Sequence, residues 1–176
     1  MMNTARKLTY SALFIAFGLI LPQFFHFLGG TGPIFLPMHI PVLLAGFLMG
    51  GPSGALVGIV TPILSSMLTG MPQIPILYFM IIELGSYGFI AGFTFKKLKL
   101  NVYVSLIVSM LVGRLFLAVG VFALQPLLGL KLSPTLYMTA SVMNGLPGML
   151  LQMILIPVIV TLLVKAGVSL DESRVR

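Results

Sequence analysis

The sequence predicts an all-α integral membrane protein, a six-helix transmembrane bundle with both termini in the cytoplasm. Its composition is the first ground, because 59% of the 176 residues are hydrophobic and only 7% are charged, against about 25% charged residues in soluble domains. The second ground is the spacing of charge. From Leu8 to Phe95 the only formally charged side chain is that of Glu83. Since one helical span needs about 20 apolar residues, the chain holds about six spans in a single transmembrane domain, residues 1–176.

The six helices are expected over residues 8–25, 38–50, 53–70, 75–95, 101–125 and 138–165. No small-residue cleavage site follows the first hydrophobic run, so we expect that helix to be retained. The second and third helices are short. The sequence Gly50-Gly51-Pro52 between them predicts a sharp turn, because glycine tolerates turn geometry and proline can begin a helix. Six full spans, or four spans with a re-entrant pair, give the same orientation for the other helices.

Lysine and arginine predict the orientation. If the N-terminus is inside, the cytoplasmic ends carry Arg6, Lys7, Lys96, Lys97, Lys99, Lys165, Arg174 and Arg176. Only Lys131 then lies outside, and Arg114 lies within a span. This is a strong positive-inside bias. Residues 26–37, 70–74 and 126–137 therefore face outward, where such proline-containing loops either line a pocket or serve as plain connections.

Ionisable side chains within spans are costly, usually face the bundle interior and indicate function. At a rise of about 1.5 Å per residue, Glu83 lies roughly 12 Å, Arg114 roughly 17 Å and Asn144 roughly 9 Å below the outer ends of their helices. This convergence on successive helices predicts a ligand pocket that opens outward. The alternative is a structural Glu83–Arg114 ion pair between two helices. The two readings overlap, because a paired arginine can still donate to a ligand.

Two further polar residues belong to this group. His39 is expected at the outer end of the second helix, where it either donates to a ligand or caps backbone groups. Gln152 lies deeper and is expected to form an interhelical hydrogen bond. A metal site is not expected, because zinc-type sites need three or four ligands and only His26, His39 and Glu83 are candidates.

Glycines at Gly46, Gly50, Gly54 and Gly58 recur at every fourth position of the second and third helices. Small-xxx-small spacing lets helix backbones approach closely. Because Pro52 interrupts this register, we expect two short packing faces rather than one.

Several functional classes are disfavoured by what the sequence lacks. There is no cysteine, which excludes disulfide and thiolate chemistry. The net charge of +7 does not indicate a nucleic-acid partner, since the basic residues form no stripe with interleaved aromatics. There is no P-loop, so active transport would need a partner to supply the energy. We expect neither an enzyme nor a bound cofactor.

An intramembrane protease and a stand-alone carrier are the rival functions. Gly51-Pro52-Ser53-Gly54 superficially resembles an intramembrane serine protease motif. That chemistry needs a base within reach of the serine, and His39 is expected at the opposite membrane face. A secondary carrier or channel for a small polar solute would be indicated by an intramembrane acid relay or by internal repeats. Only Glu83 is available for such a relay, and no internal repeat is convincing.

Several segments together resemble a known family. The first helix contains Ala12-Leu13-Phe14-Ile15-Ala16, and it is followed by MHIPVLLAGFLMGGPSGALVG, PILSSMLTGMP and ELGSYGFIAG. This combination, over nearly the whole chain, resembles the substrate-binding S component of an energy-coupling factor (ECF) vitamin transporter. The alanine motif is similar to the one through which S components dock on the shared transmembrane subunit, which would assign docking to Ala12 and Ala16.

The resemblance implies a subunit that binds a water-soluble vitamin and topples in the plasma membrane of a prokaryote. Its partners would be the lipid bilayer, a transmembrane scaffold subunit and two cytoplasmic ATPase subunits. In such proteins the first loop and the fourth to sixth helices supply the ligand contacts near the outer face.

The residues also bear on which vitamin is bound. Thiamine is disfavoured because there is no tryptophan, and nickel or cobalt because the N-terminus lacks the histidine used by metal-binding members. Aromatic residues expected toward the outer half would stack on a small ring: Phe24, Phe25, Phe27, Phe35, Tyr78, Phe79 and Tyr87. With Glu83 as an acceptor, a pyridoxine-like or hydroxymethylpyrimidine-like ligand is the first expectation. Pantothenate is the second, since its carboxylate suits Arg114, while riboflavin or folate would need a larger pocket.

Overall fold

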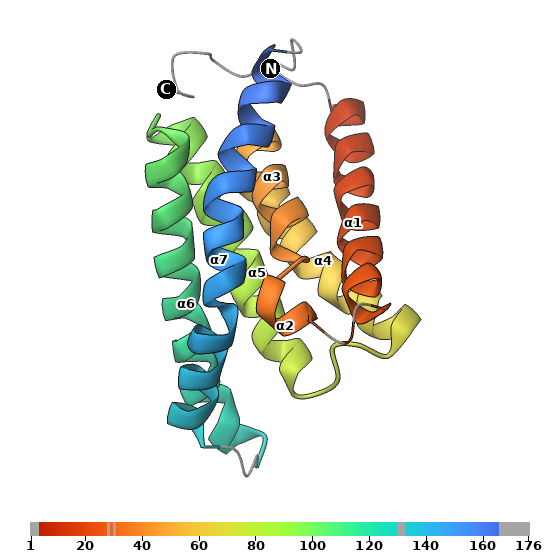
Figure 1. Cartoon of the computed structure of the whole chain (residues 1–176), viewed down its shortest axis with the longest axis vertical. Coiled ribbons are helices and arrows are strands. Elements are labelled where there is room, and N and C mark those ends of the chain that lie inside the picture. Colours follow the sequence, from red (N-terminus) through yellow and green to blue (C-terminus); the bar gives the residue numbers. More distant parts are fainter. Residues whose placement is uncertain (1–3, 28, 30, 130–132, 166–176) are drawn as a thin grey trace.

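The computed structural model describes residues 4–27, 29, 31–129 and 133–165, and this part of the chain is helical with short connections (Figure 1). The elements are α1 (Thr4–Phe27), α2 (Gly32–Phe35), α3 (His39–Met49), α4 (Gly51–Thr69), α5 (Ile76–Gly92), a π-helical turn (Phe93–Lys97), α6 (Val102–Leu127) and α7 (Pro134–Lys165). Six helical segments in these ranges are long and apolar enough to cross a membrane, with α2 and α3 together forming one of them. The predicted all-α membrane bundle is confirmed.

The hairpin between the expected second and third helices is present. Gly50 separates α3 from α4 and has φ 102°, a left-handed conformation that favours glycine. Helix α3 has 11 residues and α4 has 19, so α4 is about as long as the third helix expected over residues 53–70.

Other boundaries also differ from those expected, among them the start of the first helix, which lies at Thr4 instead of residue 8. The outward loop predicted over 26–37 contains the one-turn helix α2. The last helix begins at Pro134 instead of residue 138, because proline is well tolerated in the first turn of a helix. The cytoplasmic location of the termini stays a prediction, and Lys131, Arg174 and Arg176 lie outside the described residues.

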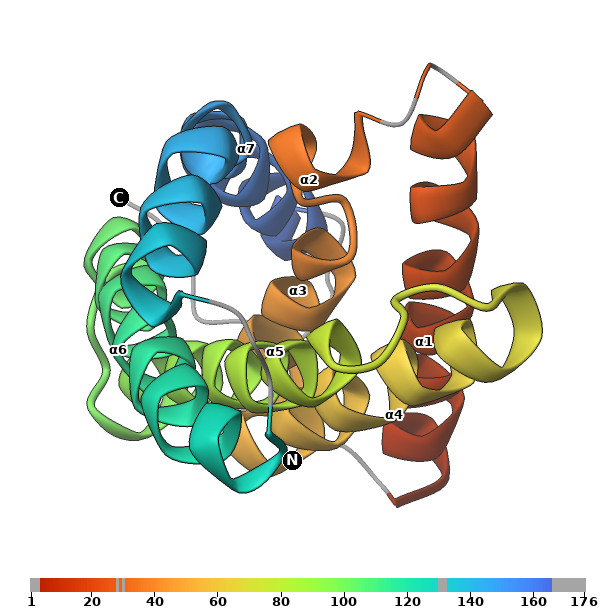
Figure 2. The same ribbon diagram turned by 90° about the horizontal axis from the view of Figure 1, so that it is seen from below.

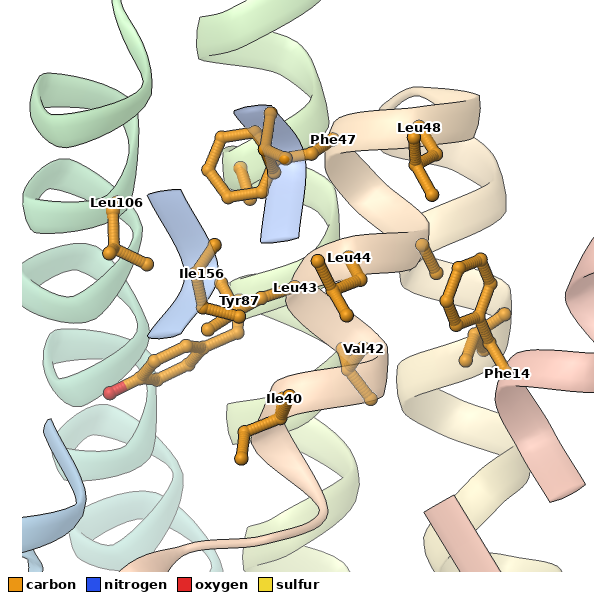
Figure 3. Close-up of a cluster of buried hydrophobic side chains, with 14 of the residues drawn as sticks. Phe14, Ile40, Val42, Leu43, Leu44, Phe47, Leu48, Tyr87, Leu106 and Ile156 are labelled. Atoms are coloured by element: carbon orange, nitrogen blue, oxygen red, sulfur yellow. The ribbon is translucent and has the colours of Figure 1, made fainter. Parts of the chain in front are cut away.

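Helix α3 forms the centre of the bundle, and all of its residues are buried. In Figure 1 it lies between α1 at one edge and α7, with α6 at the opposite edge. Phe14 of α1 and Leu106 of α6 reach the same apolar core from opposite sides, around Leu43 and Phe47 of α3 (Figure 3). This central position means that any polar residue of α3 is held inside the bundle.

Helices α4 and α5 pack with their backbones in direct contact. A Cβ atom on Gly54 would lie within 3.0 Å of the carbonyl oxygen of Gly88, and one on Gly88 would be equally close to the carbonyl oxygen of Gly54. Gly58 meets the backbone of Leu84 in the same way, and Gly46 of α3 also lies against Gly88. The predicted glycine packing is confirmed at Gly46, Gly54 and Gly58.

We predict that Gly54→Ala lowers the thermal stability of the detergent-solubilised protein. The added methyl group would force backbone away from backbone, and overpacking of this kind costs about 1–3 kcal/mol. Gly32→Ala is the matched control, because nothing lies within 4 Å of a Cβ there. A midpoint for Gly54→Ala at or above that of Gly32→Ala would contradict the tight-packing account.

Candidate functional site

A cavity of about 440 Å³ lies at the end of the bundle where α2 and the α4–α5 connection are found. Figure 2 looks onto this end and shows α2 between α1 and α7. Each of the six long helical segments contributes to the wall. The polar residues that line it are Gln23, His26, His39, Ser65, Gln73, Glu83, Arg114, Tyr137, Ser141 and Asn144. The predicted orientation makes this the outer end.

A buried ion pair is part of the polar wall of this cavity. Arg114 Nη1 of α6 lies 3.0 Å from Glu83 Oε1 of α5, and the two side chains are 12% and 7% exposed. Arg114 Nη1 also donates a hydrogen bond of 2.6 Å to Ser141 Oγ of α7. Three helices are therefore joined through one guanidinium group, and Asn144 lines the same cavity. The predicted pair and the predicted convergence of Glu83, Arg114 and Asn144 are both present.

His39 extends this cluster to α3. Its Nε2 atom lies 3.5 Å from Glu83 Oε1, and its ring meets the ring of Tyr87 edge-on at 4.9 Å. His39 is the first residue of α3, as the sequence indicated, but it is buried rather than at the bundle surface. Its side chain faces Glu83 and Tyr87 of α5, which are themselves buried.

One face of α7 holds both the arginine and the α2 segment. A Cβ atom on Gly145 would lie 2.8 Å from Arg114 Nη2, and one on Gly148 would lie 2.7 Å from the carbonyl oxygen of Ile34. One helical turn further, Gln152 Nε2 donates a hydrogen bond of 3.4 Å to the carbonyl oxygen of Leu36. The predicted hydrogen bond from Gln152 thus reaches the end of α2. The role of the two glycines was not found from the sequence, although their spacing of three residues was visible.

The cluster carries more hydrogen-bonding capacity than its neighbours use. Within the described parts of the chain, Arg114 Nε and Nη2, His39 Nδ1 and the hydroxyl group of Tyr87 are buried and form no hydrogen bond. Buried polar groups are nearly always paired in proteins, and exceptions call for an explanation. Here the exceptions belong to one cluster that includes Glu83 and Arg114, and ionisable side chains inside a membrane bundle are candidates for function.

None of the seven aromatic residues expected to stack on a ligand lines the cavity. Tyr87 is fully buried behind His39, Phe35 packs against Phe25 with ring centroids 5.3 Å apart, and Tyr78 is 38% exposed. The aromatic side chain in the wall is that of Tyr137. It was missed because residue 137 was assigned to a loop, whereas α7 begins at Pro134 and carries Tyr137 into the bundle.

No group of three potential metal-ligating side chains occurs among the described residues. His26 lines the cavity from α1, while His39 and Glu83 form the buried contact described above.

Comparison with known proteins gives one family match. The family model described as "ECF transporter, substrate-specific component" matches residues 6–160. No curated protein and no solved structure matches the chain significantly. The matched range includes all six long helical segments, apart from the first two residues of α1 and the last five residues of α7.

We predict that substitutions of Glu83 and Arg114 have strongly non-additive effects on the stability of the protein. Glu83→Gln and Arg114→Gln should each lower the free energy of unfolding in mixed micelles by about 3 kcal/mol, because each leaves one buried charge without its partner. The double variant should cost clearly less than the sum of the two. Costs that simply add would show that the two side chains do not interact energetically.

Proposed function

The chain belongs to the family of substrate-specific components of ECF transporters, and on that premise we propose that its cavity binds a small water-soluble vitamin or vitamin precursor for import. As a member of that family it is a multi-pass membrane protein and a transport subunit rather than an enzyme. The observation that carries the proposal is the Glu83–Arg114–His39 cluster beside a cavity of about 440 Å³. Small-molecule sites typically measure about 300–1,000 Å³ and place a few polar groups in a mostly apolar wall.

The ligand that fits best is a small aromatic ring with polar substituents. The cavity volume of about 440 Å³ lies toward the lower end of the range of about 300–1,000 Å³ for small-molecule sites, which suits a compact molecule. We propose a pyridoxine-like or hydroxymethylpyrimidine-like ligand, with Tyr137 beside the ring. Glu83 and Asn144 then accept from its hydroxyl or amino groups. Pantothenate is the second candidate, through its carboxylate and Arg114.

Three of the four remaining predicted site residues have supporting places in this proposal. His39 fixes the orientation of Glu83, and Tyr87 supports His39 from behind. Phe35 holds α2 against α1 through Phe25. Tyr78 is exposed on α5 near the same end of the bundle and has no part in the cavity wall.

Import by this family needs partners, and we propose a transmembrane scaffold subunit with two cytoplasmic ATPases in the plasma membrane of a prokaryote. The sequence contains no P-loop of its own. Ala12 and Ala16 are exposed on α1, which forms one edge of the bundle (Figure 1). Two small side chains four residues apart let another helix approach closely. This supports docking of the scaffold on α1.

We predict that the purified protein binds a member of a vitamin panel, as measured by calorimetry. Glu83→Gln and Arg114→Ala should each weaken that binding at least about tenfold, a loss of about 1.4 kcal/mol. Thr161→Val is the control, because its hydroxyl group bonds only within α7 and lies outside the cavity wall. Normal binding by both cavity variants would place the ligand elsewhere, and a folded protein that binds no vitamin would refute the proposal.

Ala12→Trp or Ala16→Trp should abolish uptake in cells that contain the partner subunits, while ligand binding by the purified variant stays normal. The bulky side chain would hold the scaffold helix away from α1. Leu111→Trp is the control, because Leu111 is 67% exposed on α6, at the opposite edge of the bundle. Uptake that persists in Ala12→Trp and Ala16→Trp, or that needs no partner subunit, would instead favour a stand-alone carrier.

A further inference from the structure

We propose that this site selects ligands without net charge, because Glu83 neutralises Arg114 within the cavity wall. The inference rests on the proposed function and adds to it the charge class of the ligand. Among the described residues that line the cavity, Glu83 and Arg114 are the only ones with a permanent formal charge. Their charges cancel, so the wall carries no net charge when His26 and His39 are neutral.

The arginine is not presented to the cavity as a free cation. Its Nη1 atom contacts Glu83 Oε1 at 3.0 Å and donates to Ser141 Oγ at 2.6 Å. Its Nε and Nη2 atoms each expose less than 1 Å², and Nη2 lies against Gly145 of α7. A carboxylate inside the cavity would have to compete with Glu83 for this one guanidinium group.

Such a competition has an unfavourable charge balance. With an anionic ligand the cluster would hold two negative charges and one positive charge in a largely apolar surrounding. An uncompensated buried charge is costly. A cationic ligand meets the converse problem, since Glu83 Oε1 already lies near both Arg114 and His39.

The rest of the polar wall consists of neutral hydrogen-bonding groups. Amides come from Gln23, Gln73 and Asn144, and hydroxyl groups from Ser65, Tyr137 and Ser141. Groups of this kind exchange hydrogen bonds with hydroxyl, amino or ring nitrogen atoms without requiring a charge. The structure therefore favours a pyridoxine-like or hydroxymethylpyrimidine-like molecule over pantothenate.

The test uses ligand pairs that differ chiefly in charge: pyridoxine with 4-pyridoxate, and pantothenol with pantothenate. Binding is measured by calorimetry, with both members of a pair in the same buffer. The wild-type protein should bind the uncharged member of at least one pair at least about tenfold more tightly than the acid. Tighter binding of the acid in the pair that binds would overturn the inference and leave the vitamin-binding function standing.

Charge variants test the cause of this preference. Glu83→Gln leaves Arg114 without a counter-charge, so the preference should reverse toward the acid. The double variant Glu83→Gln/Arg114→Gln is the matched control, because it restores a wall without net charge and should again prefer the uncharged member. If both variants show the same preference, the ion pair does not set the charge selectivity.

A folding defect and a loss of vitamin binding can each be distinguished from a change in charge selectivity. Should Glu83→Gln fail to fold, Arg114→Gln leaves the opposite charge uncompensated and should widen the wild-type preference against the acid by about tenfold. An unchanged ratio in Arg114→Gln would overturn the inference. A folded wild-type protein that binds neither pair and no other vitamin would refute the proposed function itself.

Discussion

The ion pair between Glu83 and Arg114 is the interaction on which the rest of this site depends. It joins α5 to α6 at 3.0 Å, and the hydrogen bond to Ser141 brings in α7, while His39 connects α3 to the same carboxylate. Charged groups are expensive within a membrane-spanning bundle unless they are paired. Side chains from four helices therefore meet in one charged cluster. This cluster lies in the wall of the cavity and gives that wall its polar character.

This centre is positioned by the close packing around it rather than by charge alone. Helix α3 is buried along its whole length, so His39 cannot turn away from Glu83. Tyr87, which supports His39, packs its ring on Gly113 of α6, where a Cβ atom would lie within 3.0 Å of ring carbons. Gly145 of α7 leaves room for the guanidinium group of Arg114. Small residues thus serve two purposes here: they bring helices together, and they leave room for the large polar side chains of the site.

The fold and the centre of the site were predictable from the sequence, while the walls of the site were not. Hydropathy and charge spacing predict the spans, and the depth of Glu83, Arg114 and Asn144 on successive helices predicts their convergence, because a helical rise converts sequence position into depth. The same reasoning gives no information on rotation about each helix axis. For that reason Tyr78 was assigned to the cavity and Ser141 was not, whereas Ser141 lines it and Tyr78 does not. The burial of His39 depends on its packing against Glu83 and Tyr87 of α5, which is a tertiary contact with no local signal.

Helix α1 buries fewer residues than the other spans, and it carries both the proposed docking residues and part of the cavity wall. It buries only Ser11, Phe14 and Gly18, whereas α4 and α5 are joined backbone to backbone. Its exposed face carries Ala12 and Ala16, and its far end contributes Pro22, Gln23 and His26 to the cavity wall. About ten residues of helix, or roughly 15 Å, separate the two regions. A partner seated on the alanine face would thus hold the same rigid helix that closes one side of the cavity, although the charged centre is built entirely by the other helices. If the proposed roles hold, ligand recognition and partner recognition would both involve α1, the first at one end of the helix and the second at its middle.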